Sequence, residues 1–202
     1  TPVGPLTASV IEAPTVDGGE NGTPTGVGVS LNMTPEEMQP DHLFVPSLGI
    51  YARINTRGDF GKLLNNTLVL PHSSEVTRWQ DGGSVTSAKG NIVIAGHVSF
   101  NGVHGALFSL SSIKAGNLAY ITDADGNRAT FQLDHSDSIL KEMLPQSIWD
   151  KYGVKRLTLV TCTGKLIKRA DGTWHFDSNQ VATFKQVFPQ SSPTATVSET
   201  QK

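Results

Sequence analysis

The chain has one cysteine, no long apolar run and few aromatic residues. A single cysteine excludes an intramolecular disulfide and a cysteine-rich zinc site. No stretch approaches the ~20 apolar residues of a membrane-spanning helix, so membrane attachment would need a segment outside these 202 residues. A formal net charge of −2 leaves no basic field to attract nucleic acid. We therefore predict no nucleic-acid partner and no metal site.

The composition is that of a loop-rich β protein. With 20 Gly, 11 Pro and 7% aromatic residues, the chain is unlike a helical bundle. Residues 1–41 are acidic and rich in Gly and Pro, with no Lys or Arg before Arg53. We expect them to be a flexible spacer, because they bury too little apolar area to offset chain entropy. Residues 42–188 are the predicted folded domain, and the Ser/Thr/Pro-rich residues 189–202 a disordered tail.

Short strands are predicted throughout the folded domain. β-Branched and apolar runs bounded by Gly, Pro or Asp-Gly turns mark them. They cover about residues 42–46, 48–54, 68–70, 91–95, 118–122, 128–133, 157–161 and 181–184, with 48–54 continuing the first strand past a Pro/Gly break. An Asp-Gly turn joins 118–122 to 128–133 as a hairpin, and residues 140–150 are the best short-helix candidate. About eight strands at this spacing predict a small β-barrel or sandwich.

Two reactive side chains close two of these strands. Cys162 follows the run 157–161 and precedes a glycine turn, and His97 follows the run 91–96. A thiol and an imidazole at the ends of core strands are the components of a Cys-His nucleophilic site, since imidazole exchanges protons near neutral pH. The alternative is a buried apolar cysteine and a packing histidine, because most free cysteines are buried.

Basic residues follow the cysteine closely. Lys165, Lys168 and Arg169 lie within seven positions of it. Positive charge favours the thiolate, on which the reactivity of a thiol depends. The same three residues are also typical of a solvated basic loop.

The residues around both positions resemble the sortase family. Ala95-Gly96-His97, followed by Gly105–Leu110 and Lys114-Ala115-Gly116, is similar to the segment around the sortase catalytic histidine. Leu157–Cys162 resembles the sortase Thr-Leu-x-Thr-Cys signature. The His-before-Cys order and the spacing agree as well, over about residues 42–186.

Trp79 and Phe44–Ile50 look most like the class F sortases of actinobacteria. The resemblance implies an eight-stranded β-barrel with one or two short helices, on the extracellular face of a Gram-positive cell membrane or in the cell wall. It implies a cysteine transpeptidase that cleaves a Leu-Pro-x-Thr-Gly sorting signal, near the C-terminus of a secreted protein, between Thr and Gly. Cys162 would form a thioester with the Thr carbonyl, and His97 would protonate the departing amine. An amine of a peptidoglycan precursor or a pilin lysine would resolve the thioester, and no cofactor is required.

One position departs from the family pattern. Sortases place an arginine just before the strand that follows the cysteine, where it holds the substrate or the oxyanion. Residues 176–179 contain no arginine. Either Arg169 folds back into the site, or Asn179 donates a weaker neutral hydrogen bond, or activity is reduced. We favour Arg169 because its fixed charge suits an oxyanion, and we expect Thr161 to shape the substrate pocket beside Asn179.

Other readings of the same residues remain to be separated. A papain-like peptidase would place Cys before His in the sequence, with the cysteine at a helix N-terminus, and an L,D-transpeptidase would show a compact Ser-His-Gly-Cys-x-Arg motif; this chain shows neither. A sortase-shaped binding or assembly module with weakened catalysis is the non-enzyme alternative. The missing arginine is its support.

Overall fold

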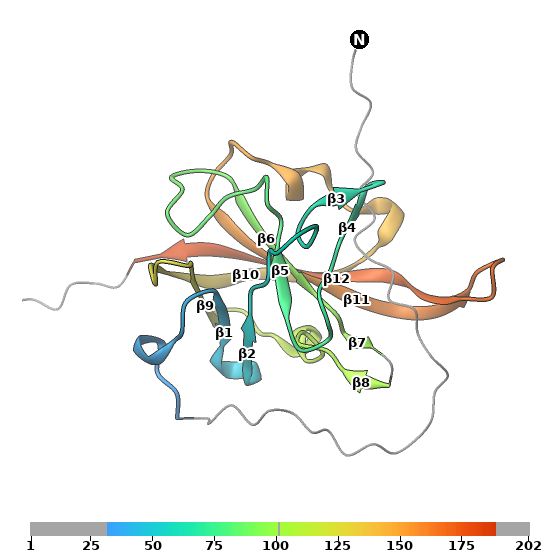
Figure 1. The fold of residues 1–202 in the computed structure, drawn as a ribbon, viewed down its shortest axis with the longest axis horizontal. Coiled ribbons are helices and arrows are strands. Elements are labelled where there is room, and N and C mark those ends of the chain that lie inside the picture. The colour runs from blue at the N-terminus through green and yellow to red at the C-terminus, as the bar shows by residue number, and fades with distance from the viewer. Residues whose placement is uncertain (1–31, 101, 189–202) are drawn as a thin grey trace, which may run out of the picture.

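Eight strands hydrogen-bond into one sheet in the order β2-β1-β9-β10-β12-β11-β6-β5 (Figure 1). A computed structural model describes residues 32–100 and 102–188. A parallel bridge between Ile54 and Val76 joins the two sheet edges, so the sheet curls into a nearly closed barrel. The predicted eight-stranded barrel is thereby confirmed. The strands are β1 (His42–Val45), β2 (Ile50–Arg53), β5 (Val76–Arg78), β6 (Asn91–Gly96), β9 (Leu118–Thr122), β10 (Arg128–Leu140), β11 (Arg156–Lys168) and β12 (Trp174–Val187).

Short elements complete the described part of the chain. Two small hairpins lie outside the main sheet, β3–β4 (Leu63–Leu64, Thr67–Leu68) and β7–β8 (Ser99–Phe100, Val103–His104). The helical elements are single 3₁₀ turns: η1 (Pro35–Glu37), η2 (Pro46–Leu48), η3 (Leu110–Ser112), η4 (Lys141–Met143) and η5 (Gln146–Trp149). The last two occupy the predicted helix at 140–150, where Pro145 prevents one continuous helix because it lacks an N–H.

The first strand is a hairpin rather than one long strand. The sequence predicted that residues 48–54 continue the strand of 42–46, but β1 and β2 pair antiparallel, Val45 opposite Ile50. Gly49 adopts a left-handed φ of 63° after η2 and reverses the chain. A glycine tolerates this backbone without a Cβ clash, so the Pro/Gly break is a turn.

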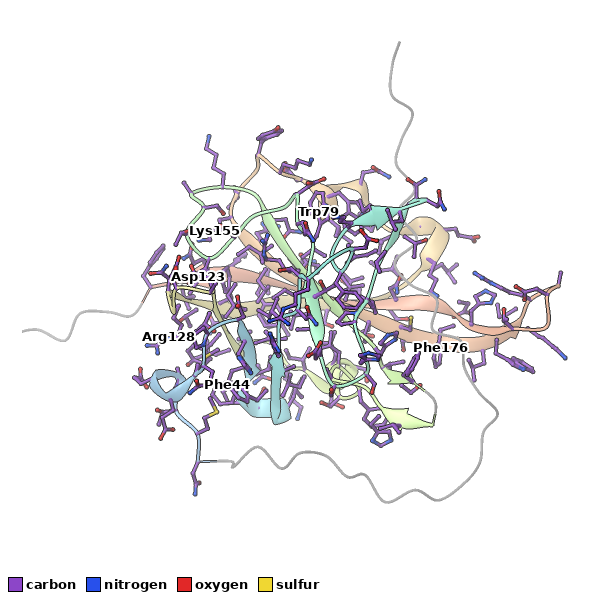
Figure 2. The ribbon with its side chains drawn as sticks, in the orientation of Figure 1. Phe44, Trp79, Asp123, Arg128, Lys155 and Phe176 are labelled. Carbon is purple, nitrogen blue, oxygen red and sulfur yellow. The ribbon has the colours of Figure 1, made fainter. Side chains whose placement is uncertain are left out.

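The strand that contains the cysteine, β11, and the strand after it, β12, are both much longer than predicted. β11 continues past Cys162 to Lys168, paired with β12, and the pairing register shifts between Thr163 and Leu166. Gly164 has a φ of 88° at this bulge, and the Lys165 N–H donates to Asp177 Oδ1 at 2.9 Å. The glycine therefore bends the strand without ending it. The extended hairpin projects beyond the barrel, with Phe176 on its second strand (Figures 1 and 2).

Part of the predicted spacer contacts the barrel. The Arg128 guanidinium donates to Pro35 O at 2.6 Å and to Glu36 Oε1 at 3.0 Å, and Figure 2 shows Arg128 on the side of the barrel where η1 lies. The Thr122 hydroxyl donates to Gln39 O at 2.6 Å. Residues 1–31 of the predicted spacer and the predicted tail 189–202 lie outside the described residues.

The sheet separates two apolar clusters. Successive side chains of a strand point to opposite faces. Leu157 and Leu159 on β11 therefore fill the barrel interior, whereas Val160 and Cys162 face a second cluster on the outside of the sheet. This outer cluster, which we call the site cluster, comprises the buried residues Leu68, Trp79, Val93, Ala95, Leu144, Ile148, Trp149, Val160, Cys162 and Val181.

Candidate active site

His97 and Cys162 meet on one face of two neighbouring parallel strands. β6 and β11 pair in parallel, and their last register pair is Ala95 with Val160. His97 and Cys162 each follow that pair by two positions, so both point to the face of Ala95 and Val160. Neighbouring strands lie about 4.8 Å apart. The register thus sets His97 and Cys162 at the ends of adjacent strands, on the same face of the sheet.

Thr161 ties the two strands together at this point. Its hydroxyl donates to the carbonyl of Gly96 at 2.8 Å, one residue beyond the last register pair. Thr161 is 2% exposed, so this bond is shielded from water. The Thr161 hydroxyl therefore helps to hold β6 in register with β11.

Replacing Thr161 with valine should lower the free energy of unfolding by about 1–3 kcal/mol, because the buried Gly96 carbonyl loses its donor. Thr161→Ser keeps the hydroxyl and should retain most of the stability. Urea denaturation of the two variants tests this. Equal stability of Thr161→Val and the parent would show that the bond contributes nothing to the alignment.

Gly105 lies directly against the backbone of His97. The Gly105 N–H donates to Val98 O at 2.9 Å, and the Leu107 N–H donates to His97 O at 3.2 Å. A Cβ on Gly105 would stand 2.0 Å from His97 O and 2.9 Å from His97 Cβ. The segment after the histidine, noted in the sequence, thus supports the histidine backbone, and a glycine is required for the close approach.

Gly105→Ala should therefore displace His97 and lower turnover at least tenfold, because small misplacements of catalytic groups are costly. Gly102→Ala is the control, since a Cβ there meets nothing within 4 Å, although the φ of +75° at this position would strain an alanine. Both variants should lose stability, and only Gly105→Ala should lose turnover beyond that loss. Equal turnover of the two variants at a temperature where both are folded would contradict this support role.

The His97 ring is held by the connection between β2 and β5. Its Nε2 contacts Pro71 O at 3.1 Å, so that nitrogen carries a hydrogen, and Phe100 packs on the ring with centroids 5.0 Å apart. Among the described residues, the buried Nδ1 has no hydrogen-bond partner. Burial lowers the His97 pKa, the Pro71 carbonyl opposes this, and the nearby His72 lowers it further. The neutral imidazole is therefore the resting form at neutral pH.

The Cys162 thiol is buried beside a cation. It is 3% exposed, and the Lys141 ammonium forms a side-chain hydrogen bond with it. Burial raises the pKa of Cys162, and the charge and hydrogen bond of Lys141 pull it back down. In turn, burial lowers the pKa of Lys141, while Cys162 and Asp177 favour its charged form. The resting pair is thus a thiol and an imidazole, with Lys141 favouring the thiolate.

Two segments cover the pair on the outside of the sheet. One is the β2–β5 connection, which contributes Leu68 to the site cluster and Pro71 to His97. The other carries η4 and η5, and it contributes Leu144, Ile148 and Trp149. His97 is 6% exposed beneath them. A peptide substrate therefore reaches the thiol only when part of this cover moves.

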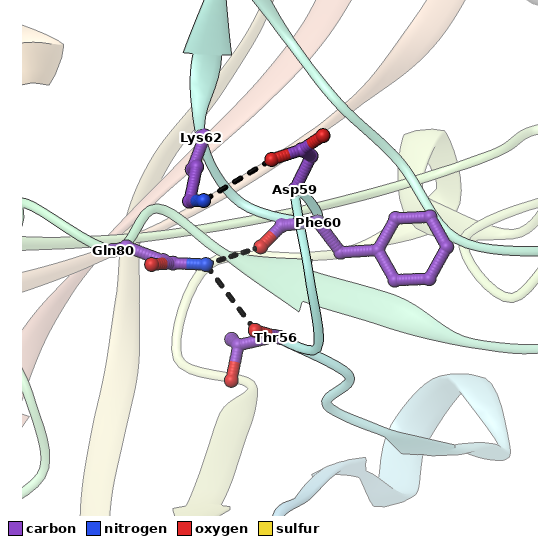
Figure 3. Close-up of polar contacts among 5 residues, drawn as sticks. All are labelled: Thr56, Asp59, Phe60, Lys62 and Gln80. Carbon is purple, nitrogen blue, oxygen red and sulfur yellow. Dashed lines mark hydrogen bonds and ion pairs between the residues drawn. The ribbon is translucent and has the colours of Figure 1, made fainter.

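Each cover is fixed at its base by polar contacts. Gln80 Nε2 donates to Thr56 O at 3.2 Å and to Phe60 O at 2.8 Å, and Lys62 pairs with Asp59 at 3.1 Å (Figure 3). The second cover is held by the Asn91 side chain, which donates to Ile148 O at 2.8 Å. The bases of both covers are thus anchored, and the residues between the anchors are those that must move.

A groove runs along the outer face of the sheet, and neither Cys162 nor His97 is among its lining residues. Its cavity has a volume of about 380 Å³ and lies under the η4–η5 segment. Cys162 is opposite Asn179 on β12, and Asn179 is opposite Ile139 on β10, so this row of the sheet leads from the thiol to the groove. Ile139, Val181 and Ile148 give the near part an apolar lining. The far part is polar, with His135, Asp137, Thr158, Thr183, Asp150 and Arg156 among its lining residues.

The structure does not bring Arg169 to the thiol. Arg169 closes the tip of the β11–β12 hairpin, where its N–H donates to Thr173 O at 2.7 Å. At about 3.3 Å per residue, its α-carbon lies roughly 20 Å along the strand from that of Cys162. Its charge acts instead on Asp171 and His175 at the tip. The bulge at Gly164 carries the strand onward, and this prevents the fold-back that the sequence led us to favour.

Asn179 lies next to the thiol. It is directly opposite Cys162 in the β11–β12 register, and its Nδ2 donates to Thr161 O at 3.3 Å. It is fully buried. Asn179 thus supports the strand that carries the nucleophile, and a substrate contact would require it to become accessible.

Lys141 is the site residue that sequence reasoning missed. It lies 21 positions before Cys162, and no local motif connects the two. Its proximity arises because β10 ends at Leu140, opposite Ser178 on β12, and β12 lies between β10 and β11. Only the order of the strands in the sheet, which the sequence did not give, could have identified it.

Within residues 32–100 and 102–188, no group of three or more His, Cys, Asp or Glu side chains is placed to hold a metal ion. Over the same ranges, no helix has the length and apolarity to cross a membrane.

Comparison with known proteins identifies the family. A family model described as a sortase domain matches residues 43–173, more than half of the chain, and the chain therefore belongs to the sortase family. A comparison with curated protein sequences gave no match.

Solved sortase structures share the fold. Sortase C1 of pilus island 1 of group B Streptococcus aligns with a TM-score of 0.52 at 14% identity, over 75% of this chain and 66% of that one. Sortase C-1 of Actinomyces oris aligns with a TM-score of 0.53 at 15% identity, over 73% of each. The chain thus spans just under two thirds of the first of these structures. Both are class C sortases by name, so the class F resemblance stays a prediction.

Proposed function

We propose that this chain is a sortase transpeptidase in which Cys162 is the nucleophile and His97 the general acid and base. The observation that carries the proposal is the parallel register of β6 and β11, which sets the imidazole and the thiol on one face of the sheet. Membership of the sortase family supports the reaction class.

The proposed reaction has two steps. The Cys162 thiol gives its proton to His97, Cys162 Sγ attacks the carbonyl carbon of the Thr–Gly bond of a sorting signal, the C–N bond breaks, and His97 passes that proton to the departing Gly amine. A thioester between Cys162 and the Thr carbonyl remains. The acceptor amine then attacks this thioester, loses a proton to His97 and releases the sulfur as thiolate.

The groove is the proposed seat for the part of the signal before the scissile bond. Its near, apolar part, lined by Ile139, Val181 and Ile148, begins on β12 next to the strand of Cys162, extends to β10, and suits the Leu-Pro portion of the signal. The polar far part would then face residues further upstream in the substrate. Substrates would be secreted proteins with a C-terminal sorting signal, and the enzyme would act on the extracellular face of the membrane or in the cell wall.

The acceptor amine is also part of this proposal. An amine of a peptidoglycan precursor or a lysine of a pilin subunit would resolve the thioester, as the family resemblance implies. Both acceptors are uncharged primary amines when they attack, so the chemistry at Cys162 is the same for each.

A binding or assembly module without turnover is the second candidate. One observation favours it: Cys162 and His97 are almost fully covered. Such a module would hold a sorting peptide and leave it intact.

Turnover of a peptide with a Leu-Pro-x-Thr-Gly core, labelled at both ends, separates the two functions. The transpeptidase should release the C-terminal label and, with an added amine such as triglycine, join the N-terminal part to it. A peptide with Pro in place of the Gly should stay intact, because its leaving group is a secondary amine. Binding without release of either label would contradict the transpeptidase and favour the module.

A further inference from the structure

Lys141 occupies a position at the thiol that no local motif predicts. It begins η4 immediately after β10, whose last residue, Leu140, pairs with Ser178 of β12. Ser178 is adjacent to Asn179, which is opposite Cys162 on β11. Three neighbouring strands therefore bring Lys141 to the sulfur, and its ammonium forms a hydrogen bond with the thiol.

Asp177 is a negative charge that favours the charged form of Lys141. It lies on β12 beside Ser178, and it accepts hydrogen bonds from Ser178 Oγ at 2.8 Å and from the Lys165 N–H at 2.9 Å. The carboxylate is thus fixed by its own donors. A half-buried ammonium needs such a partner, because burial alone favours its neutral form.

Other charged and titratable groups near the site lie on β6, on the β2–β5 connection and on β12. His97 follows β6, and His72 lies near it on the β2–β5 connection. His175 on β12 lies within reach of the charges of Lys141 and Arg169. Lys141 is the group whose charge acts on Cys162 and whose side chain also forms a hydrogen bond with it.

We propose that Lys141 is a catalytic residue: it stabilises the Cys162 thiolate by charge and hydrogen bond, and it supplies the cation that residues 176–179 lack. The proposal deepens the function proposed above and rests on it, because a catalytic role requires that the transpeptidase reaction takes place. A lysine differs from an arginine as a compact point charge with no bidentate fork. The proposed role of Lys141 is therefore to stabilise the charge on the sulfur, and it does not include bidentate binding of the peptide.

The thiol itself reports on Lys141 without any peptide. The rate of alkylation by iodoacetamide follows the thiolate fraction, so its pH profile gives the ionisation of Cys162. Lys141→Met should move the midpoint of that profile to higher pH and slow alkylation at pH 7 about tenfold or more, the ratio that corresponds to one pKa unit. Lys141→Arg should stay near the parent, because it restores the charge.

Two further variants separate charge from packing. Lys141→Gln keeps a hydrogen-bond donor without the charge and should behave like Lys141→Met; it also carries the test if Lys141→Met does not fold. Lys114→Met removes an exposed lysine between η3 and β9 and should leave the profile unchanged. Thermal unfolding of each variant confirms that the fold is retained.

The outcomes are distinct from those for the proposed function. A midpoint unchanged in both Lys141→Met and Lys141→Gln would overturn the proposal, and so would a shift in Lys141→Arg as large as in Lys141→Met. If the parent cleaves no sorting peptide, the proposed function fails, whereas the alkylation profile still decides whether Lys141 ionises Cys162. Where the parent does cleave, Lys141→Met should lower kcat with little change in KM, and a change in KM alone would contradict a role at the sulfur.

Discussion

Cys162→Ala should abolish peptide cleavage, with a loss of about 10⁴-fold or more, because the proposed reaction passes through a thioester on this sulfur. Cys162 packs in the site cluster, where the smaller alanine leaves a small cavity, so the fold should persist at a modest cost in stability. Steady-state cleavage of a labelled Leu-Pro-x-Thr-Gly peptide measures the loss.

Cys162→Ser is the matched variant for this prediction. It keeps the size of the side chain and supplies a hydroxyl, which is a far weaker nucleophile than a thiolate at neutral pH. It should be as inactive as Cys162→Ala while remaining folded. Cleavage by either variant at more than a few per cent of the parent rate would show that the nucleophile lies elsewhere.

His97→Ala should lower turnover about 10²–10⁴-fold, the usual worth of general acid and base catalysis. His72→Ala is the control, since His72 lies near His97 and perturbs it by charge only. The control should change turnover less than threefold. A similar, small loss in both variants would show that His97 packs without donating a proton.

The two pKa directions set the pH profile of the parent. Burial lowers the His97 pKa and raises that of Cys162, so the neutral pair dominates between the two pKa values. The reactive pair, imidazolium with thiolate, carries the same number of protons and is therefore a constant minor fraction over that range. Turnover should be flat between the two pKa values, fall at lower pH as the thiolate is protonated, and fall at higher pH as the imidazolium is lost. His97→Ala should remove the high-pH fall that belongs to the imidazolium.

The core strands could be predicted because their apolar pattern is local. The runs at 91–96 and 157–161 are apolar and β-branched over five or six consecutive residues, which is typical of a strand buried on both faces. The hairpin around Asp125-Gly126 was equally visible, and β9 and β10 pair antiparallel as predicted. The placement of His97 and Cys162 on one face depends on the parallel pairing of β6 with β11, which no local pattern in the sequence indicated.

The parts that could not be predicted depend on contacts between distant residues. Gly164 looks like a turn in the sequence, but Asp177 on the facing strand receives the Lys165 N–H and keeps the pairing intact. Because β11 continues, Arg169 lies at the hairpin tip. Lys141 reaches the sulfur through a strand order in which β12 separates β10 from β11. A bulge and a strand order are tertiary properties, and neither has a local signature.

The cover over the pair connects the structure to the chemistry. Burial keeps both groups neutral at rest. Once water is excluded, the same burial would strengthen the attraction between the Lys141 ammonium and the Cys162 thiolate. Gln80 anchors the first cover and Asn91 anchors η5 of the second, so we expect the β3–β4 hairpin and the η4 end of the second cover to move when a substrate enters. Entry through the η4–η5 side would place the peptide in the groove beside Ile139.

The most direct measurement is the intact mass of the parent protein after brief incubation with a sorting peptide and an acid quench. The mass should rise by that of the peptide fragment that ends in Thr, and the adduct should map to Cys162 by fragmentation and be removed by hydroxylamine. A folded parent whose thiol reacts with iodoacetamide but carries no such adduct, or carries it on another residue, would rule out Cys162 as the nucleophile.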